Sequence, residues 1–582
     1  MQQVRIHRAD IEGLRALAIL AVLAFDTSAR WLSGGFAGIG IFFALSGYLI
    51  TSTVVADLER GAFDLRSFYD RRLRRLLPAL LVVLIAVFVA GWFLLFADEY
   101  RALGRDMAGA AALDDGRAPT RILGHLWPGA ALLPFYVAWP LLLRALRQRP
   151  GIVEAVIGVL FASFLAANLS GGWELMAGCG LAVLQRRGWQ WQGPGADLAT
   201  VLGLLLLAAG FALGPPGRWA MLPVLGALLV LSAGPGSWFS RRVLGNPVAV
   251  ALGLLGYPLY LWHWPLLAFL QVADSTVPTP NERSAAVALT VLLAGATYRF
   301  VERPVRRRAG TGALLACAIG VAAIGFGCYR MNGFPGTGLR DSEQQAFLDF
   351  FAAEEIEAGC ATKCTERDPT RRHAVLLWGD SHAQELYGGL QRSLPADWQI
   401  LQVARPGCFP DATVAGPSTS DACRQSNWTA LQAIAAARPD VVIVAQDRGQ
   451  LIWHYNVTGK ILNGLGVTRT LFLGPTPRWR TGLPTIVARQ LWRDTPRRTF
   501  VGIDPSQRVL NETLTDRFTT SETMAFVDVM GAFCDRTGCL TYIGDDRRAG
   551  LTSGDDSHLR PVASDYLARQ VLVRMIVGII KE

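Results

Sequence analysis

GALLACAIGVAAIGFGC, residues 312–328, is the last long apolar run of the 582-residue chain. Similar runs follow one another upstream of it, whereas short apolar and polar stretches are mixed after Tyr329. The chain is 51% hydrophobic and only 18% charged, while a soluble domain has about 25% charged residues. The sequence therefore predicts a transmembrane domain over 1–310, a last transmembrane helix and linker over 311–334, and a separate domain over 335–582.

Eleven apolar segments precede Tyr329, and several are near the length of about 20 residues that crosses a bilayer as a helix. The segments are 11–31, 36–55, 78–97, 124–145, 151–168, 171–185, 196–214, 218–234, 246–271, 283–300 and 312–328. Every second loop between them is rich in arginine, as in 60–75 and 303–308. Because arginine-rich loops stay in the cytoplasm, we expect a cytoplasmic N-terminus. An odd number of crossings then places the C-terminal domain on the other side.

The formal net charge is +10, a balance that many nucleic-acid-binding proteins share. Here the arginines cluster in short loops between apolar segments, which is typical of membrane topology. The partner that this pattern predicts is the lipid bilayer, and no nucleic acid is expected.

Cysteine usage differs between the two parts of the chain. Six of the nine cysteines follow residue 359, and six cysteines in an exported domain favour disulfides. Pairing of sequence neighbours predicts Cys360–Cys364, Cys408–Cys423 and Cys534–Cys539, although six cysteines allow fifteen connectivities and free thiols are the alternative. No spacing of Cys and His is typical of a zinc site, so no metal is predicted.

Short apolar runs recur in the C-terminal part, at 373–378, 441–445, 470–473 and 524–529. Helical patterns lie between and after them, for example at 381–393, 426–437 and 561–580. Alternating strands and helices predict an α/β domain with a mostly parallel sheet. Helices on both faces of that sheet give the expected three layers.

The GDSH motif of residues 379–382 follows the first of these runs directly. A serine at a strand-to-helix turn lies at the carboxyl edge of the sheet, where α/β sites form. Serine needs a base, and the DDSH motif of 555–558 supplies one before the terminal helix. In the D-x-x-H spacing Asp555 can orient His558, which takes the serine proton. Ser381, His558 and Asp555 are therefore the predicted catalytic residues.

The two motifs, in this order, resemble the SGNH (GDSL-like) hydrolase family, whose first block carries the serine and whose last carries D-x-x-H. The resemblance implies an oxyanion site made by amides at Ser381, at Gly407 in a second block, and at a third block. Gln446 stands where the family usually has an asparagine. The alternative is a degenerate relative without activity. His382 is interpreted as a packing or turn residue, and Asp556 as a solvated neighbour.

Motifs in the membrane part carry a second resemblance. They are RADIEGLRA at Arg8–Ala16, GGFAGIGIFFALSGYLIT at Gly34–Thr51, Ser67–Tyr69, Trp173–Leu175, YLWHWP at Tyr260–Pro265 and YRFVERP at Tyr298–Pro304. Over nearly all of 5–308 the sequence looks like the acyltransferase-3 family, which is also known fused to a C-terminal SGNH domain. The resemblance implies an O-acyltransferase, most simply an O-acetyltransferase, of the bacterial inner membrane. Its donor would be a cytoplasmic acyl-CoA such as acetyl-CoA, its acceptor a surface or lipid-linked glycan, and its SGNH domain would be periplasmic, with no bound cofactor.

The sequence departs from that family at residues suited to proton transfer. Arg15 is present, but Asp26 stands where members carry a histidine, and Gly40 replaces an acid. The motif at 125–140 keeps its frame but has leucine or alanine in place of two glutamates. A carboxylate inside a span is costly and is a functional candidate by default, so Arg15 and Asp26 are the membrane-domain candidates. The alternative is a salt bridge from Asp26 to Arg15 or Arg30.

Three functions stay open at this stage. The first is acyl transfer to a surface polysaccharide, with the acyl group carried by Ser381. The second is a periplasmic carbohydrate esterase tethered to a membrane scaffold that has lost its activity, with His263 structural. The third is a transporter or assembly scaffold without catalysis. Transfer and hydrolysis use the same triad, and exclusion of water from the pocket decides between them.

Overall fold

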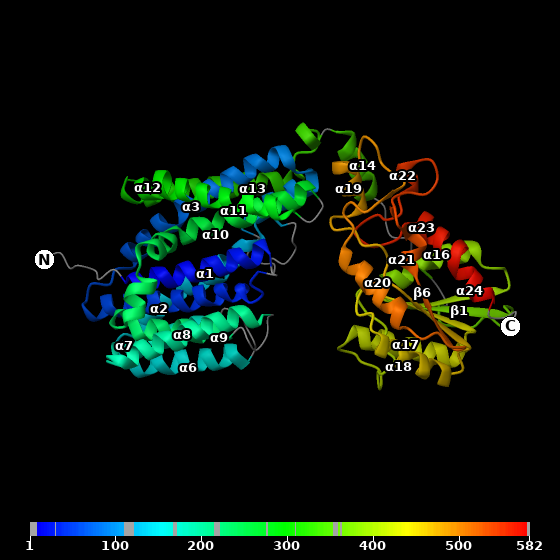
Figure 1. Ribbon diagram of the computed structural model, residues 1–582, viewed down its shortest axis with the longest axis horizontal. Helices are drawn as coiled ribbons and strands as arrows, with labels where there is room; N and C mark the ends of the chain where they lie inside the picture. The colour runs from blue at the N-terminus through cyan, green and yellow to red at the C-terminus, as the bar shows by residue number, and fades with distance from the viewer. Residues whose placement is uncertain are drawn as a thin grey trace. The chain divides into compact units, whose positions relative to one another are not determined.

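The computed structural model describes residues 8–28, 31–109, 121–166, 172–214, 221–274, 278–308, 310–340, 342–352, 359–360 and 364–578. It contains two compact units: Met1–Gln271 with Pro278–Arg340, and Asp341–Glu582 with the short segment Val272–Val277. The first unit is helical, and the second is built on a β-sheet (Figure 1).

Each of the eleven predicted apolar segments contains a helix in its described residues, and the helices lie side by side (Figure 1). They are α1 (Ala9–Thr27), α2 (Gly38–Glu59), α3 (Leu65–Leu94), α5 (Trp127–Ala145), α6 (Pro150–Ala166), α7 (Gly172–Arg186), α8 (Pro194–Leu213), α9 (Met221–Ala233), α10 (Pro247–Asp274), α11 (Pro280–Ala296) and α13 (Thr311–Arg330). In the described residues, six helical stretches are long and apolar enough to cross a membrane. They are Gly35–Glu59, Leu65–Leu94, Gly124–Ala145, Pro194–Leu213, Pro280–Arg306 and Thr311–Arg330. The number of crossings stays a prediction.

Helix α3 begins well before the apolar segment 78–97 that the sequence predicts. The side chain of Asp64 accepts a hydrogen bond of 2.8 Å from the backbone N–H of Ser67 and so caps the helix at Leu65. A capping side chain satisfies a backbone donor that the first turn leaves unpaired. The arginines of 66–75 therefore lie on the first turns of a helix. The sequence analysis predicts a loop there, and that prediction is wrong. A further helix in this unit, α4 (Ala97–Met107), is not predicted by the apolar pattern.

Helices α2 and α7 approach closely through glycines. A Cβ atom on Gly47 would lie 2.1 Å from the carbonyl oxygen of Leu175, and one on Gly178 would lie 2.0 Å from that of Ala44. Small residues let helices approach in this way when no water is available to drive their association. The approach also brings the buried side chain of Glu174 beside Gly40, where a Cβ would lie 3.5 Å from its Oε1 atom.

The second unit contains a five-stranded sheet in which every pairing is parallel. Its strands are β1 (His373–Gly379), β2 (Trp398–Ala404), β3 (Val441–Ala445), β4 (Arg469–Leu473) and β6 (Met524–Val527), in the order β2-β1-β3-β4-β6. The chain runs from β1 outward to β2 and then crosses back to β3. The order therefore reverses between β1 and β3, and parallel sheets form their sites at such a point.

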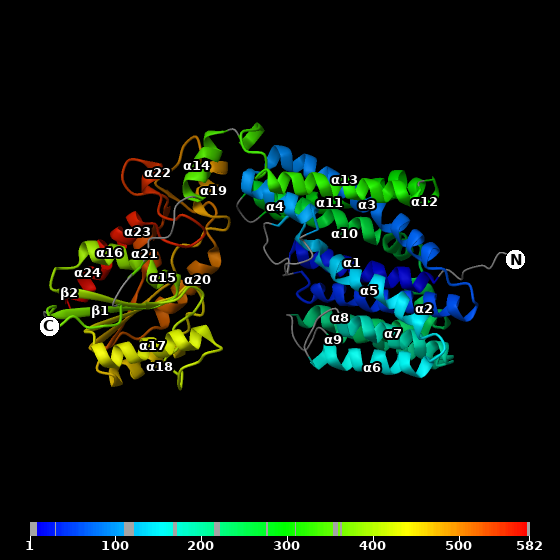
Figure 2. The same ribbon diagram turned by 180° about the vertical axis from the view of Figure 1, so that it is seen from behind.

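Helices cover both faces of this sheet (Figures 1 and 2). Successive strand residues point to opposite faces, so Leu377 packs with Leu386 and Leu567, whereas Leu376 packs in a second cluster with Leu431. The covering helices are α16 (Leu386–Ser393), α23 (Pro561–Leu567) and α24 (Val573–Gly578) on one face, and α17 (Ala422–Ala437) and α18 (Ile452–Gly464) on the other. The remaining helices are α14 (Glu343–Ala352), α15 (Ser381–Gln384), α19 (Leu483–Gln490), α20 (Pro505–Arg517), α21 (Val529–Phe533) and α22 (Arg547–Gly550).

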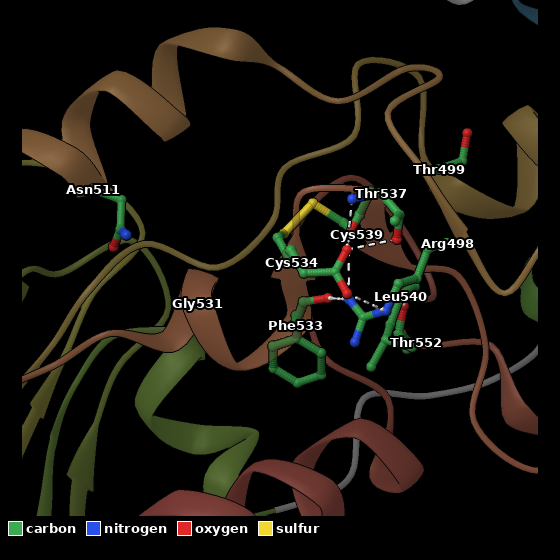
Figure 3. Close-up of a disulfide and its surroundings, with 12 residues drawn as sticks. Arg498, Thr499, Asn511, Gly531, Phe533, Cys534, Thr537, Cys539, Leu540 and Thr552 are labelled. Carbon is green, nitrogen blue, oxygen red and sulfur yellow. Dashed lines mark hydrogen bonds and ion pairs between the residues drawn. A yellow bond between two sulfur atoms is a disulfide. The ribbon is translucent and has the colours of Figure 1, made fainter.

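The three predicted disulfides are confirmed: Cys360–Cys364, Cys408–Cys423 and Cys534–Cys539. The last joins β7 (Cys534–Asp535) to β8 (Gly538–Leu540), which pairs in turn with β5 (Arg498–Thr499). Figure 3 shows Arg498 beside this bond, where its guanidinium donates to the carbonyl oxygen of Phe533 at 2.6 Å. A small antiparallel sheet is thus fixed both covalently and by a charged hydrogen bond.

Candidate active site

The candidate nucleophile lies at the reversal point of the sheet. Strand β1 ends at Gly379, where a Cβ atom would lie 1.8 Å from the carbonyl oxygen of Ala445 at the end of β3, so only glycine fits. Asp380 follows and caps helix α15, accepting a hydrogen bond of 2.9 Å from the backbone N–H of His382. Ser381 is the first residue of that helix. The sharp strand-to-helix turn leaves its side chain partly exposed.

Ser381, His558 and Asp555 form one chain of hydrogen bonds. Nε2 of His558 lies 2.8 Å from Oγ of Ser381, and Nδ1 lies 2.6 Å from Oδ2 of Asp555. The other carboxylate oxygen of Asp555 accepts the backbone N–H groups of Ser557 and His558 at 2.9 and 2.8 Å. The structure thus brings together the three residues predicted from sequence, 177 positions apart in the case of Ser381 and His558.

The electrostatics of this chain suit a base at His558. Burial would raise the pKa of Asp555, but the hydrogen bonds from His558 and the backbone outweigh it and lower the pKa to about 2. Asp555 is therefore ionised at neutral pH. Its hydrogen bond raises the pKa of His558 above the usual value. With its Nδ1–H held by the carboxylate, the imidazole presents Nε2 as an acceptor to the serine hydroxyl.

Asp380 connects the two loops that flank the reversal point. Its Oδ1 caps α15, while Oδ2 accepts a hydrogen bond of 2.7 Å from the backbone N–H of Asp447, just after β3. The side chain is 4% exposed, and burial raises its pKa. Sequence reasoning did not assign a role to this residue, although an aspartate directly before a helix is a capping signal. It holds the nucleophile turn against the loop that carries Gln446.

His382 and Glu385 form a second layer behind the triad that the sequence analysis missed. The ring of His382 stacks on that of His558, with centroids 4.8 Å apart and planes at 16°. Its Nδ1 lies 3.3 Å from Oε1 of Glu385, and Nε2 lies 3.4 Å from Oδ1 of Asp447, which also pairs with Arg478. Burial would lower the pKa of His382, but the Glu385 carboxylate outweighs it and raises that pKa. Because it stacks on His558 and lies close to the carboxylates of Glu385 and Asp447, His382 is more than a plain packing residue.

Glu385 also positions the loop that follows the histidine. Its Oε2 accepts the backbone N–H of Leu559 at 2.9 Å, and its backbone carbonyl accepts the hydroxyl of Ser564 at 2.7 Å. The side chain is only 2% exposed. A sequence signal exists, because Glu385 is a lone acid on a helical face otherwise made by Ala383 and Leu386, and a buried charge is retained only with partners.

The two other oxyanion candidates lie at the same edge of the sheet. Gly407 lies in the loop after β2 at φ +75°, a left-handed conformation that favours glycine, and the disulfide of Cys408 holds that loop. Gln446 follows β3 and is 4% exposed. Its Nε2 donates to the carbonyl of Arg448 at 2.8 Å. One of its two N–H bonds is thus used within its own loop, so the third oxyanion donor stays a prediction.

The membrane-domain candidates do not come together. Nη1 of Arg15 pairs with Glu12 at 2.6 Å, whereas Oδ2 of Asp26 lies 3.0 Å from Nε2 of His263 on α10. Eleven residues of α-helix separate Arg15 and Asp26, a rise of about 16 Å. The alternative of a salt bridge between these two residues is therefore wrong, and Arg30 lies outside the described residues. Within those residues, no group of three or more His, Cys, Asp or Glu side chains could hold a metal ion.

Comparisons with known proteins divide the chain in the same two parts. A family model described as "Acyltransferase domain" matches residues 8–299, and one described as "SGNH domain (fused to AT3 domains)" matches 349–572. The chain is 26% identical over 367 residues to the peptidoglycan O-acetyltransferase OatA of Listeria monocytogenes, covering 52% of this chain and 56% of that protein. It is 27% identical over 351 residues to the O-acetyltransferase OatA of Staphylococcus aureus, covering 51% and 57%. The chain thus matches about half the length of these curated relatives.

A solved structure, the periplasmic domain of a Salmonella ser. Paratyphi A lipopolysaccharide acetyltransferase, matches 40% of this chain and 97% of that domain. The identity is 20% and the TM-score 0.33. The acyltransferase model covers half of the 582 residues and includes the motifs that indicated this resemblance. The chain therefore belongs to the acyltransferase-3 family, in the form that carries a C-terminal SGNH domain.

Proposed function

We propose that the protein is a membrane-bound O-acetyltransferase of a cell-surface or periplasmic polysaccharide, with Ser381 as the residue that carries the acetyl group. The observation that carries this proposal is the chain of hydrogen bonds from Ser381 through His558 to Asp555 at the reversal point of the sheet. Relatives named as O-acetyltransferases, one of them of peptidoglycan, favour a glycan hydroxyl as the acceptor.

The proposed chemistry has two steps at one serine. Oγ of Ser381 attacks the acetyl carbonyl carbon, Nε2 of His558 takes the hydroxyl proton, and that proton then leaves with the departing group. A sugar hydroxyl next attacks the acetyl-serine and gives its proton to His558, which returns it to Oγ. Backbone amides at Ser381 and Gly407, with the Gln446 amide, stabilise the negative charge on the carbonyl oxygen. Asp555 stabilises the imidazolium that forms in each step.

The proposed topology assigns the donor and the acceptor to opposite sides of the bacterial inner membrane. Eleven crossings with a cytoplasmic N-terminus leave the SGNH domain, a three-layer α/β domain, in the periplasm. The three disulfides of that domain support an oxidising compartment. Acetyl-CoA is the proposed donor, and the helical unit delivers its acetyl group across the bilayer.

One alternative rests on a specific observation. The helical unit lacks the histidine and the acids that its family carries, since Asp26, Gly40 and the leucine and alanine residues of 125–140 replace them. An esterase tethered to an inactive scaffold would show the same triad, with water as the second nucleophile. The two functions differ in the donor, which is acetyl-CoA or an acetylated glycan, and in the second nucleophile, which is a sugar hydroxyl or water.

The test uses the full-length protein in lipid nanodiscs. Acetyl-CoA labelled in the acetyl group and soluble peptidoglycan fragments are supplied, and acetylated glycan is measured by mass spectrometry. In parallel the same protein receives an acetylated sugar, and release of acetate is measured. Ser381→Ala is the test variant, and Ser393→Ala, at the end of α16 in the same unit, is the matched control.

We expect glycan acetylation by the unaltered protein and by Ser393→Ala, and none by Ser381→Ala. Transfer that survives in Ser381→Ala would show that the serine does not carry the acetyl group. Acetate release without transfer from acetyl-CoA would overturn the transferase proposal in favour of the tethered esterase.

A further inference from the structure

Asp26 on α1 and His263 on α10 meet inside the helical unit, 237 positions apart in the sequence. Oδ2 of Asp26 lies 3.0 Å from Nε2 of His263, and the side chains are 17% and 2% exposed. Both helices belong to the apolar bundle. Ionisable side chains in such a place are costly and mark functional sites by default.

The hydrogen bonds of His263 decide how many protons this pair holds. Nδ1 lies 2.6 Å from the backbone carbonyl oxygen of Tyr260, which can only accept, so Nδ1 must carry a proton. In the neutral ring Nε2 is then an acceptor, and it faces a carboxylate oxygen, which is also an acceptor when ionised. A contact of 3.0 Å needs one more proton, either on Nε2 as an imidazolium or on the carboxyl of Asp26. The pair therefore holds one shared proton.

A second buried histidine, His125, adjoins the pair. The ring of His125 lies 5.6 Å from that of His263 between centroids, edge to face at 81°. His125 is 7% exposed, and among the described residues neither of its ring nitrogens has a hydrogen-bond partner. A buried polar group without a partner is destabilising. The ring nitrogens of His125 therefore offer hydrogen-bonding capacity for a polar substrate group close to the Asp26–His263 pair.

We propose that Asp26 and His263, with His125 beside them, are the proton-exchange site of the helical unit; this inference rests on the proposed acetyl transfer from acetyl-CoA. When the acetyl group of acetyl-CoA moves to a hydroxyl, the thioester C–S bond breaks and an ester C–O bond forms, the hydroxyl gives up its proton, and the leaving sulfur gains one. The pair supplies one proton and takes up the other, so it returns to its starting state and the reaction balances.

A purely structural role for the pair makes a different prediction. If the contact only ties α1 to α10, any side chain that keeps the hydrogen bond will do. Asp26→Asn is such a change, because the new amide N–H can donate to Nε2 of a neutral His263 at the same distance, while the exchangeable proton is lost. Asp26→Leu removes both the hydrogen bond and the proton.

The experiment measures three quantities for each full-length variant in nanodiscs: acetyl transfer from acetyl-CoA to peptidoglycan fragments, acetate release from an acetylated sugar, and the unfolding temperature. For Asp26→Asn we expect transfer at least about 100-fold lower, with acetate release and unfolding temperature as in the unaltered protein. Asp26→Leu should also lose thermal stability. His263→Gln and the double variant Asp26→Asn/His263→Gln should be no worse than Asp26→Asn, because the two residues act as one unit. His125→Phe keeps an aromatic ring and should lower transfer without changing acetate release.

Transfer by Asp26→Asn at the unaltered rate would overturn the inference while leaving the proposed function intact. If the transfer activity of these variants falls only in proportion to the amount of folded protein, the pair is a structural contact and the inference is overturned. If the unaltered protein releases acetate but transfers nothing from acetyl-CoA, the transferase proposal and this inference fail together.

Discussion

The candidate sites of the two units each contain a histidine paired with an aspartate, and the pairs differ in what the other ring nitrogen meets. In the SGNH unit Nδ1 of His558 donates to Asp555, so Nε2 is free to accept from Ser381. In the helical unit Nδ1 of His263 donates to the carbonyl of Tyr260, so Nε2 faces the carboxylate of Asp26. The same two residue types therefore make a base for a nucleophile in one unit and a holder of a shared proton in the other.

Exposure follows the same division. Asp555 and His558 have side chains that are 46% and 23% exposed, as a site for a large glycan requires. His263 is 2% exposed. A partly exposed pair can exchange protons with water during hydrolysis or transfer, whereas a buried pair exchanges them only with groups brought to it.

The largest expected effect tests the nucleophile of the exposed pair. Ser381→Ala should lower both acetyl transfer and acetate release by about 10⁴-fold or more, because the residues of a triad act as a unit. Rates are measured by mass spectrometry of the glycan and by coupled detection of acetate. Residual activity above a few per cent would show that Oγ of Ser381 is not the attacking atom.

A smaller loss is expected when the carboxylate of the exposed pair is neutralised. Asp555→Asn should lower the rate of acetate release by about 10³- to 10⁴-fold, because an amide no longer fixes the tautomer of His558 or stabilises the imidazolium. The neighbouring Asp556→Asn is the matched control, since Asp556 is exposed and lies outside the hydrogen-bond chain. Equal losses in the two variants would contradict the assigned role of Asp555. In the buried pair, the corresponding Asp26→Asn should affect transfer alone.

The neighbouring His382 should act on the exposed pair through the pKa of His558. Glu385, Asp380, Asp447, Arg478 and His558 are the charged or titratable groups around it. Its positive charge lowers the pKa of His558, in opposition to Asp555, which raises it. Activity needs neutral His558 and is lost as the pH falls through that pKa. In His382→Gln this lowering of the pKa of His558 disappears, so that pKa rises. The acid limb of the pH–rate profile should then move to higher pH.

The rate of His382→Gln at its new optimum should be within about tenfold of the unaltered rate, because this residue positions and tunes the base without touching the substrate. The measurement is kcat and KM for acetate release between pH 5 and 9, with Glu385→Gln as a second variant. Glu385 itself raises the pKa of His558, so Glu385→Gln should not move the limb to higher pH as His382→Gln does. If the acid limb of the pH–rate profile moves in neither variant, the role of His382 is limited to packing.

The smallest expected effect concerns the cysteines, whose bonding state also differs between the two units. The second unit contains the three disulfides, whereas Cys179, Cys317 and Cys328 of the first are free. Opening a disulfide destabilises a fold more when it closes a longer loop. Replacing Cys534 and Cys539, five positions apart, by serine should lower the free energy of unfolding of the second unit by about 2 kcal/mol.

For Cys408 and Cys423, which are 15 positions apart, the same replacement should cost about 3 kcal/mol. Denaturant unfolding of the full-length variants, followed by tryptophan fluorescence, measures the difference. The helical unit should unfold unchanged in both. The reverse order of the two losses would contradict the loop-length argument.

Features set by neighbouring residues could be predicted from the sequence. The eleven apolar segments are helices because their backbone groups must pair within each segment when no water is present. The three disulfides join cysteines 4, 15 and 5 positions apart, so the pairing of sequence neighbours predicted them. Asp555 and His558 are three positions apart, and Ser381 lies just after a buried strand. The local geometry of these residues therefore follows from their own motifs.

Tertiary structure alone decided the contacts between distant segments. Asp26 meets His263 across 237 positions, and Glu385 meets Leu559 across 174. Each of these depends on how two elements pack, and packing is set by many weak contacts spread over both surfaces. A local pattern fixes which face a residue takes on its own helix or strand, but not which element comes to cover that face.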